Sequence, residues 1–126
     1  MSGILGLRTT IYKVDNLTEA VEWYTKAFET APYFNEPFYV GFNIGGYELG
    51  LLPDEDSATS LKTGNVVTYW GVDDIESEFK RFTDLGAIPN ETPENVGGDI
   101  VTASIKDPWN NVIGLIYNPE FSLGKI

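Results

Sequence analysis

The spacing of apolar and polar residues along the chain predicts an alternation of strands and helices. Residues 8–14 are rich in β-branched and aromatic side chains, which favour a strand. Apolar residues then recur every three or four positions, as in an amphipathic helix, with Asn16 as the expected N-cap and Glu19 as its capping-box partner. The elements expected in this half are a strand over 8–14, a helix over 17–28, and strands over 38–44 and 47–52 joined by a Gly-Gly turn.

The second half repeats this order after a polar segment over residues 53–64. The elements expected there are a strand over 65–72, a helix that follows Asp73-Asp74 and ends at Gly86, a weaker extended stretch over 88–96, and strands over 99–106 and 111–117. The segment Val14-Asp15-Asn16-Leu17 aligns with Val72-Asp73-Asp74-Ile75. A repeated strand-helix-strands unit explains this order better than chance does.

These elements predict an α+β fold in a single domain over residues 1–126. Repeat one covers about residues 5–53, a linker about 54–64, and repeat two about 65–119. Each repeat is expected to be a βαβββ unit whose helix covers one face of its sheet and leaves the other bare. Pairing the two bare faces would form a curled mixed sheet around a cup-shaped cavity.

Composition and charge exclude several classes of function. The chain has 126 residues, 42% of them hydrophobic, and a net charge of −11 that repels phosphate backbones, so nucleic acid is not an expected partner. It has no cysteine and no histidine, which excludes disulfides, thiolate catalysis and a Ser-His-Asp triad. No basic region precedes an apolar run at the start, and no apolar stretch approaches the ~20 residues of a membrane span. A cytoplasmic protein without a membrane partner is therefore expected.

Several short motifs occur in an order typical of one superfamily. They are Val14-Asp15-Asn16-Leu17 followed by residues 22–28, then residues 42–49, residues 71–75, and Asp107-Pro108-Trp109-Asn110-Asn111. In this order the chain resembles the vicinal oxygen chelate superfamily, which includes glyoxalase I, the bleomycin-resistance proteins and the extradiol dioxygenases. The resemblance covers nearly the whole chain and implies the βαβββ fold and a homodimer. It implies little about the activity.

The resemblance also identifies four positions where metal-dependent members bind one divalent ion. The matching positions here are Thr9, Glu48, Val67 and Gly114. Glu48 alone is of the type found in those members, and one carboxylate beside a hydroxyl cannot build the nitrogen and oxygen shell of such a site. Neither a metal nor another cofactor is therefore expected. The acids of the linker, Asp54, Glu55 and Asp56, are expected to be solvated.

Strand alternation predicts which side chains face the cup, because residues two apart share one face of a strand. The predicted ligand-binding set is Thr9, Ile11, Lys13, Glu48, Val67, Tyr69, Gly114 and Ile116, with Gly50, Leu52, Gly71 and Val112 on the same face. The opposite face, expected to pack against helices, holds Thr10, Tyr12, Val14, Leu49, Leu51, Val66, Trp70, Ile113 and Leu115. For residues 38–44 and 99–106 the inward parity stays open.

The expected pocket is apolar, with a small gap at Gly114 and a single acid, Glu48. Glu48 would accept a hydrogen bond from a ligand or pair with a ligand cation, and the alternatives are a pair with Lys13 or exposure to solvent. The preferred function is a metal-free binding protein that sequesters a small organic, possibly cationic, molecule. One alternative is a lyase, isomerase or dioxygenase of the superfamily that uses Glu48, with Tyr69 or Lys13 as titratable helpers. The other is a structural or regulatory dimer whose cup is filled by side chains.

Overall fold

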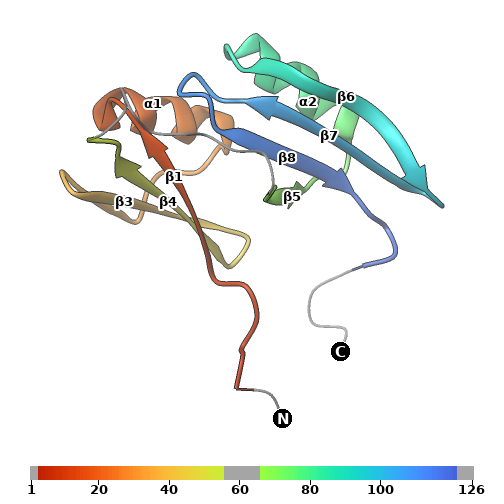
Figure 1. Ribbon diagram of the computed structural model, residues 1–126, viewed down its shortest axis with the longest axis horizontal. Helices are drawn as coiled ribbons and strands as arrows, with labels where there is room; N and C mark the ends of the chain where they lie inside the picture. Colours follow the sequence, from red (N-terminus) through yellow and green to blue (C-terminus); the bar gives the residue numbers. More distant parts are fainter. Residues whose placement is uncertain (1–2, 56–65, 122–126) are drawn as a thin grey trace. The chain divides into compact units, whose positions relative to one another are not determined.

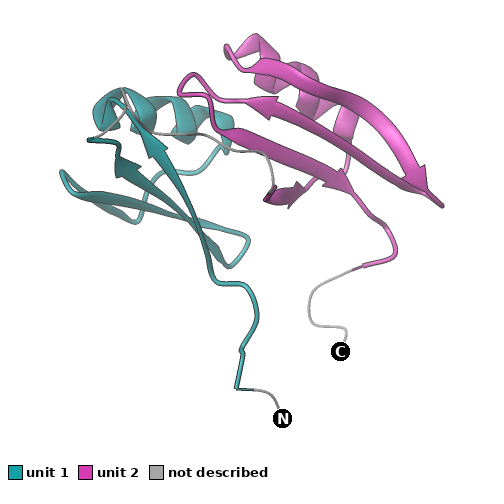
Figure 2. Cartoon of the chain, in the orientation of Figure 1, with its two compact units in different colours: residues 1–61 teal, residues 62–126 magenta. Residues whose placement is uncertain are grey.

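The computed structural model describes residues 3–55 and 66–121, and the chain divides into unit 1, residues 1–61, and unit 2, residues 62–126 (Figure 2). The elements of unit 1 are β1 (Thr9–Val14), α1 (Leu17–Ala27), β2 (Phe34–Glu36), β3 (Tyr39–Ile44) and β4 (Tyr47–Pro53) (Figure 1). Those of unit 2 are β5 (Tyr69–Gly71), α2 (Ile75–Asp84), β6 (Ile88–Gly97), β7 (Ile100–Lys106) and β8 (Val112–Tyr117). Each unit is therefore a βαβββ unit of an α+β fold, as the sequence predicts.

The sheet of unit 1 has four strands in the order β1-β4-β3-β2. β1 and β4 are parallel, while β3 is antiparallel to both β4 and β2. One face packs against α1, because the fully buried side chains of β3 and β4 have the same parity as the buried Tyr12 and Val14 of β1. This core consists of Tyr12, Val14, Ala20, Tyr24, Ala27, Val40, Phe42, Leu49 and Leu51. Tyr24 lies at its centre, stacked 5.9 Å from Tyr12 and 5.7 Å from Phe28 between ring centroids.

Unit 2 repeats this arrangement with the strand order β5-β8-β7-β6. β5 is parallel to β8, and the remaining pairs are antiparallel. Its core consists of Ile75, Phe82, Ala87, Ala103, Ile105, Ile113 and Leu115. The turn before β8 is held by Asp107, whose buried carboxylate accepts from the backbone N–H groups of Trp109 at 2.9 Å and Asn111 at 2.7 Å.

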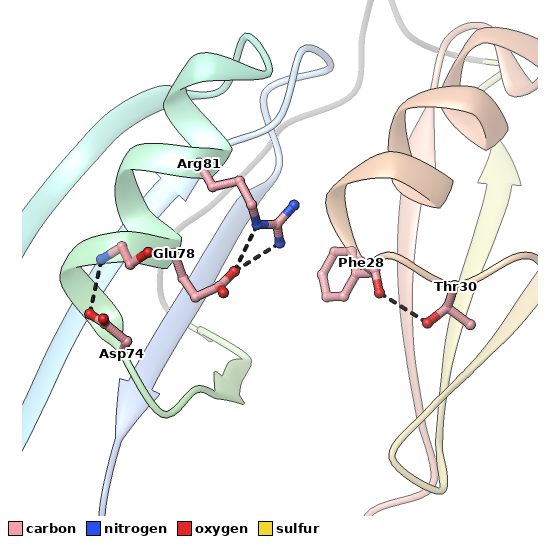
Figure 3. Close-up of polar contacts among 6 residues, drawn as sticks. Phe28, Thr30, Asp74, Glu78 and Arg81 are labelled. Carbon is pink, nitrogen blue, oxygen red and sulfur yellow. Dashed lines mark hydrogen bonds and ion pairs between the residues drawn. The ribbon is translucent and has the colours of Figure 1, made fainter.

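Both helices begin at the caps that the sequence predicts. Asn16 Oδ1 accepts from the Glu19 N–H at 3.1 Å in α1, and Asp74 Oδ1 accepts from the Ser77 N–H at 3.1 Å in α2 (Figure 3). Arg81 donates twice to Glu78 Oε1, at 3.0 and 2.8 Å, one turn along α2 (Figure 3). No helix in the described ranges is long and apolar enough to cross a membrane.

Three local expectations are corrected, and one strand, β2, is additional to those predicted, because three exposed residues carry too little pattern. The strand expected over 65–72 is only Tyr69–Gly71, so Val66, expected against a helix, is 80% exposed. Asp54, expected in solvent, is 8% exposed, and its N–H donates to the Val14 carbonyl at 2.8 Å, which continues the β1–β4 pairing by one residue. The gap expected at Gly114 is filled, because the Tyr69 ring lies over this glycine.

Glu55 is exposed as expected. Asp56 and most of the predicted linker lie outside the described residues. The cup that the sequence predicts between the two repeats stays a prediction.

Candidate functional site

The face of the unit 1 sheet opposite α1, called the open face of unit 1, carries the predicted residues of the first repeat. Thr9, Ile11 and Lys13 are exposed there, and by register Thr9 lies opposite Glu48 and Ile11 opposite Gly50. The parity left open for residues 38–44 is settled by the core. Val40 and Phe42 are fully buried with α1, so Tyr39, Gly41 and Asn43 lie on the open face.

Glu48 on β4 is the centre of a hydrogen-bonded cluster on this face. The Tyr33 hydroxyl donates to Glu48 Oε1 at 2.8 Å, and the Tyr39 hydroxyl donates to Glu48 Oε2 in a short hydrogen bond. The partners expected for Glu48 from the sequence are a ligand, Lys13 or solvent, whereas its two tyrosine partners are not predicted by the sequence. Each carboxylate oxygen is thus fixed by its own donor. We call Glu48 with Tyr33 and Tyr39 the Glu48 clamp.

Two glycines give the clamp its room on the sheet. A Cβ atom at Gly41 would lie 2.9 Å from Glu48 Oε2 and 3.2 Å from the Tyr33 ring. A Cβ atom at Gly50 would overlap the Tyr39 hydroxyl and lie 2.8 Å from its ring. Real Cβ atoms essentially never approach closer than 3.0 Å, so a larger residue at either position would shift Glu48 or Tyr39. The clamp therefore lies directly against bare backbone.

Two further aromatic side chains, Phe34 of β2 and Phe38, lie beside the clamp. The Phe34 ring lies 6.2 Å from that of Tyr39 and 6.0 Å from that of Phe38, the latter edge-on. Phe34 is 39% exposed, and Tyr33 and Phe38 are each 63% exposed. We call Tyr33, Phe34, Phe38 and Tyr39 the aromatic hairpin. It presents large apolar surface next to a fixed carboxylate.

The two tyrosine hydroxyls of the clamp keep their protons at neutral pH. The hydrogen bond to Glu48, followed by desolvation and the charge of Glu48, raises the pKa of Tyr33. Desolvation by burial, followed by the hydrogen bond to Glu48, raises the pKa of Tyr39. Both residues therefore act as donors to Glu48 and not as bases.

The open face of unit 2, opposite α2, carries the predicted residues of the second repeat. Tyr69 is 42% exposed, and a Cβ atom at Gly114 would lie 2.6 Å from its ring. Ile116 is half-buried and lies opposite Gly71, whereas Val67 precedes β5 and is half-buried. For residues 99–106, the buried Ala103 and Ile105 place Ser104 on the open face.

A polar cluster on unit 2 is centred on Ser104, which is fully buried. Its hydroxyl donates to Glu91 Oε1 at 2.9 Å and accepts from Asn90 Nδ2 at 2.9 Å. By register, Tyr69, Gly114, Ser104 and Glu91 form one row across this sheet. The matching row of unit 1 is Ile11, Gly50, Gly41 and Phe34.

The donor set does not fit the divalent metal that the fold family uses. Among residues 3–55 and 66–121, no group of three or more histidine, cysteine, aspartate or glutamate side chains is placed to hold an ion. The four matching positions hold a threonine, Glu48, a valine and a glycine, and both oxygens of Glu48 already accept from tyrosines. The residues at these four positions therefore do not form a ligand set for that ion.

Comparison with known proteins supports the fold. A glyoxalase-related enzyme from Fulvimarina pelagi is similar with a TM-score of 0.76 at 15% identity, over 97% of this chain and 94% of the other. A lactoylglutathione lyase from Agrobacterium tumefaciens gives 0.73 at 18% identity, over 93% and 96%. The fosfomycin resistance protein FosX from Listeria monocytogenes gives 0.71 at 17% identity, over 94% and 95%. At these identities the likeness concerns the fold alone.

A search of the curated proteins finds no match. The sequence model of one family, described as the Glyoxalase/Bleomycin resistance protein/Dioxygenase superfamily, matches residues 6–115, which is most of the chain. The chain therefore belongs to the glyoxalase/bleomycin resistance protein/dioxygenase superfamily.

Proposed function

We propose that this protein binds a small organic cation on the open face of unit 1, without a metal, and that Glu48 is the anionic anchor. The observation that carries this proposal is the Glu48 clamp, a carboxylate fixed by two hydroxyls beside the exposed rings of Tyr33, Phe34 and Phe38. Fixing an acceptor before a ligand arrives reduces the ordering entropy that binding must overcome.

Charge and surface chemistry both favour a cationic ligand. Tyrosine and phenylalanine faces attract cations by about 0.5–2 kcal/mol, depending on how far the site is desolvated. The chain carries 19 acidic against 8 basic residues, so the field of the whole protein attracts cations as well. Ile11, 49% exposed on the same face, offers apolar contact to the remainder of the ligand.

Thr9 and Lys13 lie on the same open face of unit 1 and are part of this proposal. The ligand-binding residues predicted on unit 2 stay a prediction: Val67, Tyr69, Gly114 and Ile116. The homodimer implied by the family resemblance is likewise proposed. Its test is the molar mass of the protein in solution.

The alternative is an enzyme of the superfamily in which Glu48 takes a proton from a substrate. The described geometry favours binding over this role, because the two groups hydrogen-bonded to Glu48 are tyrosines whose raised pKa keeps them protonated. Neither serves as a second base, so Glu48 would have to act alone. Turnover of a substrate that stops in Glu48→Gln would decide for the enzyme.

The test is thermal unfolding with a panel of aromatic organic cations. Ligand in 100-fold excess over its Kd stabilises the folded state by about 2.7 kcal/mol, which raises the Tm measurably. We expect the rise in wild type and in Glu94→Gln, which alters an exposed acid on β6 of unit 2, but not in Glu48→Gln. An equal rise in Glu48→Gln would contradict the proposal. A rise in no variant with any cation would favour the structural dimer.

A further inference from the structure

We infer that the cation bound by Glu48 is a planar, two-pronged one, an amidinium or guanidinium group, and not a simple ammonium. This inference rests on the proposed function, because it specifies the ligand class of the same site. It follows from which oxygens of Glu48 are used and which acceptor positions remain.

The clamp divides its donors evenly between the two oxygens of the carboxylate. Tyr33 donates to Oε1 and Tyr39 donates to Oε2. A carboxylate has about four lone-pair positions, two on each oxygen. With the two hydroxyls on the outer sides of the carboxylate, the two inner positions remain, one on each oxygen and parallel to each other. A pair of parallel N–H groups fills these two positions, whereas a single N–H group would leave one oxygen incompletely bonded.

Amidinium and guanidinium groups present such parallel N–H pairs. Their bidentate hydrogen bonds to carboxylates add geometric specificity to the attraction of charges. An ammonium group is a compact, strongly hydrated charge whose donors point in three directions. It gains less from two acceptors fixed side by side.

The surroundings of the clamp favour a flat cation for a second reason. The ring centroids of Phe34 and Tyr39 lie 6.2 Å apart, and both residues belong to the aromatic hairpin beside Glu48. Delocalised planar cations stack on aromatic faces and are weakly hydrated, so they lose less hydration free energy on leaving water than an ammonium group does. The bare backbone at Gly41 keeps the carboxylate and the Tyr33 ring close to the sheet. The same surface thus accommodates a flat group lying against it.

The test compares three ligands of nearly equal size: benzamidine, benzylamine and the neutral benzamide. Calorimetric titration up to about 10 mM detects even millimolar binding. We expect benzamidine to bind wild type about tenfold more tightly than benzylamine does, and benzamide to show no binding. Glu48→Gln should lose the binding of benzamidine, and the control Glu94→Gln should keep it.

Tyr33→Phe provides the variant that keeps the carboxylate. Removing the hydroxyl frees a second acceptor position on Oε1. The affinity of the variant for benzylamine should then approach its affinity for benzamidine, so the tenfold difference between the two should become smaller.

The outcomes separate this inference from the proposed function. Equal binding of benzylamine and benzamidine, both lost in Glu48→Gln, would overturn the inference and leave the proposed function standing. Failure of benzamidine to bind, while other cations of the panel stabilise wild type through Glu48, would do the same. Binding of no cation would overturn both.

Discussion

Glu48 is held in place by two neutral residues, and this has consequences for how stability depends on pH. Because Tyr33 and Tyr39 donate to a carboxylate, their protons are bound more tightly in the folded protein than in the unfolded chain. Alternation along β4 predicts the face of Glu48. The partners of Glu48 are not predictable in this way, because Tyr33 precedes β2 and reaches Glu48 only when β2, β3 and β4 have paired.

The pH prediction follows from the direction of these pKa shifts. The ordinary pKa of tyrosine is 10.0, and folding raises it for both residues. The clamp's contribution to stability is therefore fully present below pH 10.0 and is lost as the pH rises above it, because the unfolded chain loses its tyrosine protons first. We expect the urea midpoint of wild type to fall more steeply between pH about 9 and about 11 than that of the double variant Tyr33→Phe/Tyr39→Phe.

Tyr47→Phe is the matched control for that measurement. Tyr47 is half-buried at the start of β4, and its hydroxyl makes no hydrogen bond with any residue that the structure describes. It should show the wild-type slope. A double variant with that same slope would mean that the two clamp tyrosines titrate alike in the folded and unfolded states.

At the scale of elements, each unit has a glycine on its parallel-paired central strand beneath a tyrosine ring. Tyr39 lies over Gly50 on β4, and Tyr69 lies over Gly114 on β8. By register, Gly50 and Gly114 are equivalent positions of the two repeats, opposite Ile11 and Tyr69 respectively. The covering ring comes from β3 in one unit and from β5 in the other. The two repeats thus share the glycine, whereas the tyrosine that covers it comes from a different strand in each.

Alanine substitution tests these two positions. A Cβ atom at Gly50 meets the Tyr39 side chain, and one at Gly114 meets the Tyr69 ring at 2.6 Å and the Thr68 carbonyl at 2.8 Å. We expect each substitution to lower the free energy of unfolding by about 1–3 kcal/mol, as overpacking does. Gly114→Ala should have the larger effect, because the Thr68 carbonyl is backbone and already accepts from the Gly114 N–H. Urea unfolding measures both.

The control is Gly71→Ala on β5. A Cβ atom there meets nothing within 4 Å, so its free energy of unfolding should stay within about 0.5 kcal/mol of wild type. A Gly50→Ala variant as stable as this control would show that Tyr39 moves aside without loss.

The sequence predicts most elements because their periodicity is strong, and it fails where pairing decides the length of a strand. Both helices, their caps and strands β3, β4, β7 and β8 lie within one or two residues of the expected bounds. β5 is shorter than expected because it is an edge strand that pairs with β8 over three residues only. β2 pairs with β3 over three residues, Phe34–Glu36, and its exposed side chains lack an alternating pattern. The lengths of these two edge strands depend on tertiary pairing, which local composition does not predict.

At the scale of the whole molecule, the fold leaves the function to a few side chains. Proteins of similar fold include one described as a lactoylglutathione lyase and another as a fosfomycin resistance protein. A fold shared at 17–18% sequence identity does not by itself indicate a shared activity. The proposed function rests on a carboxylate that is hydrogen-bonded to two tyrosines, in a molecule with a net charge of −11.

Salt separates the contribution of that net charge from the contribution of Glu48. The Debye length is about 30 Å at 0.01 M ionic strength and about 3 Å at 1 M, so high salt screens distant acids and leaves direct contacts largely intact. We expect calorimetric titration to show that wild type binds benzamidine severalfold more weakly at 1 M than at 0.01 M NaCl, and still measurably, because the contact with Glu48 persists. Complete loss at 1 M would assign the attraction to the general field of the protein. Affinity independent of salt would assign it to the clamp and the aromatic hairpin alone, with the remaining acids serving no part in binding.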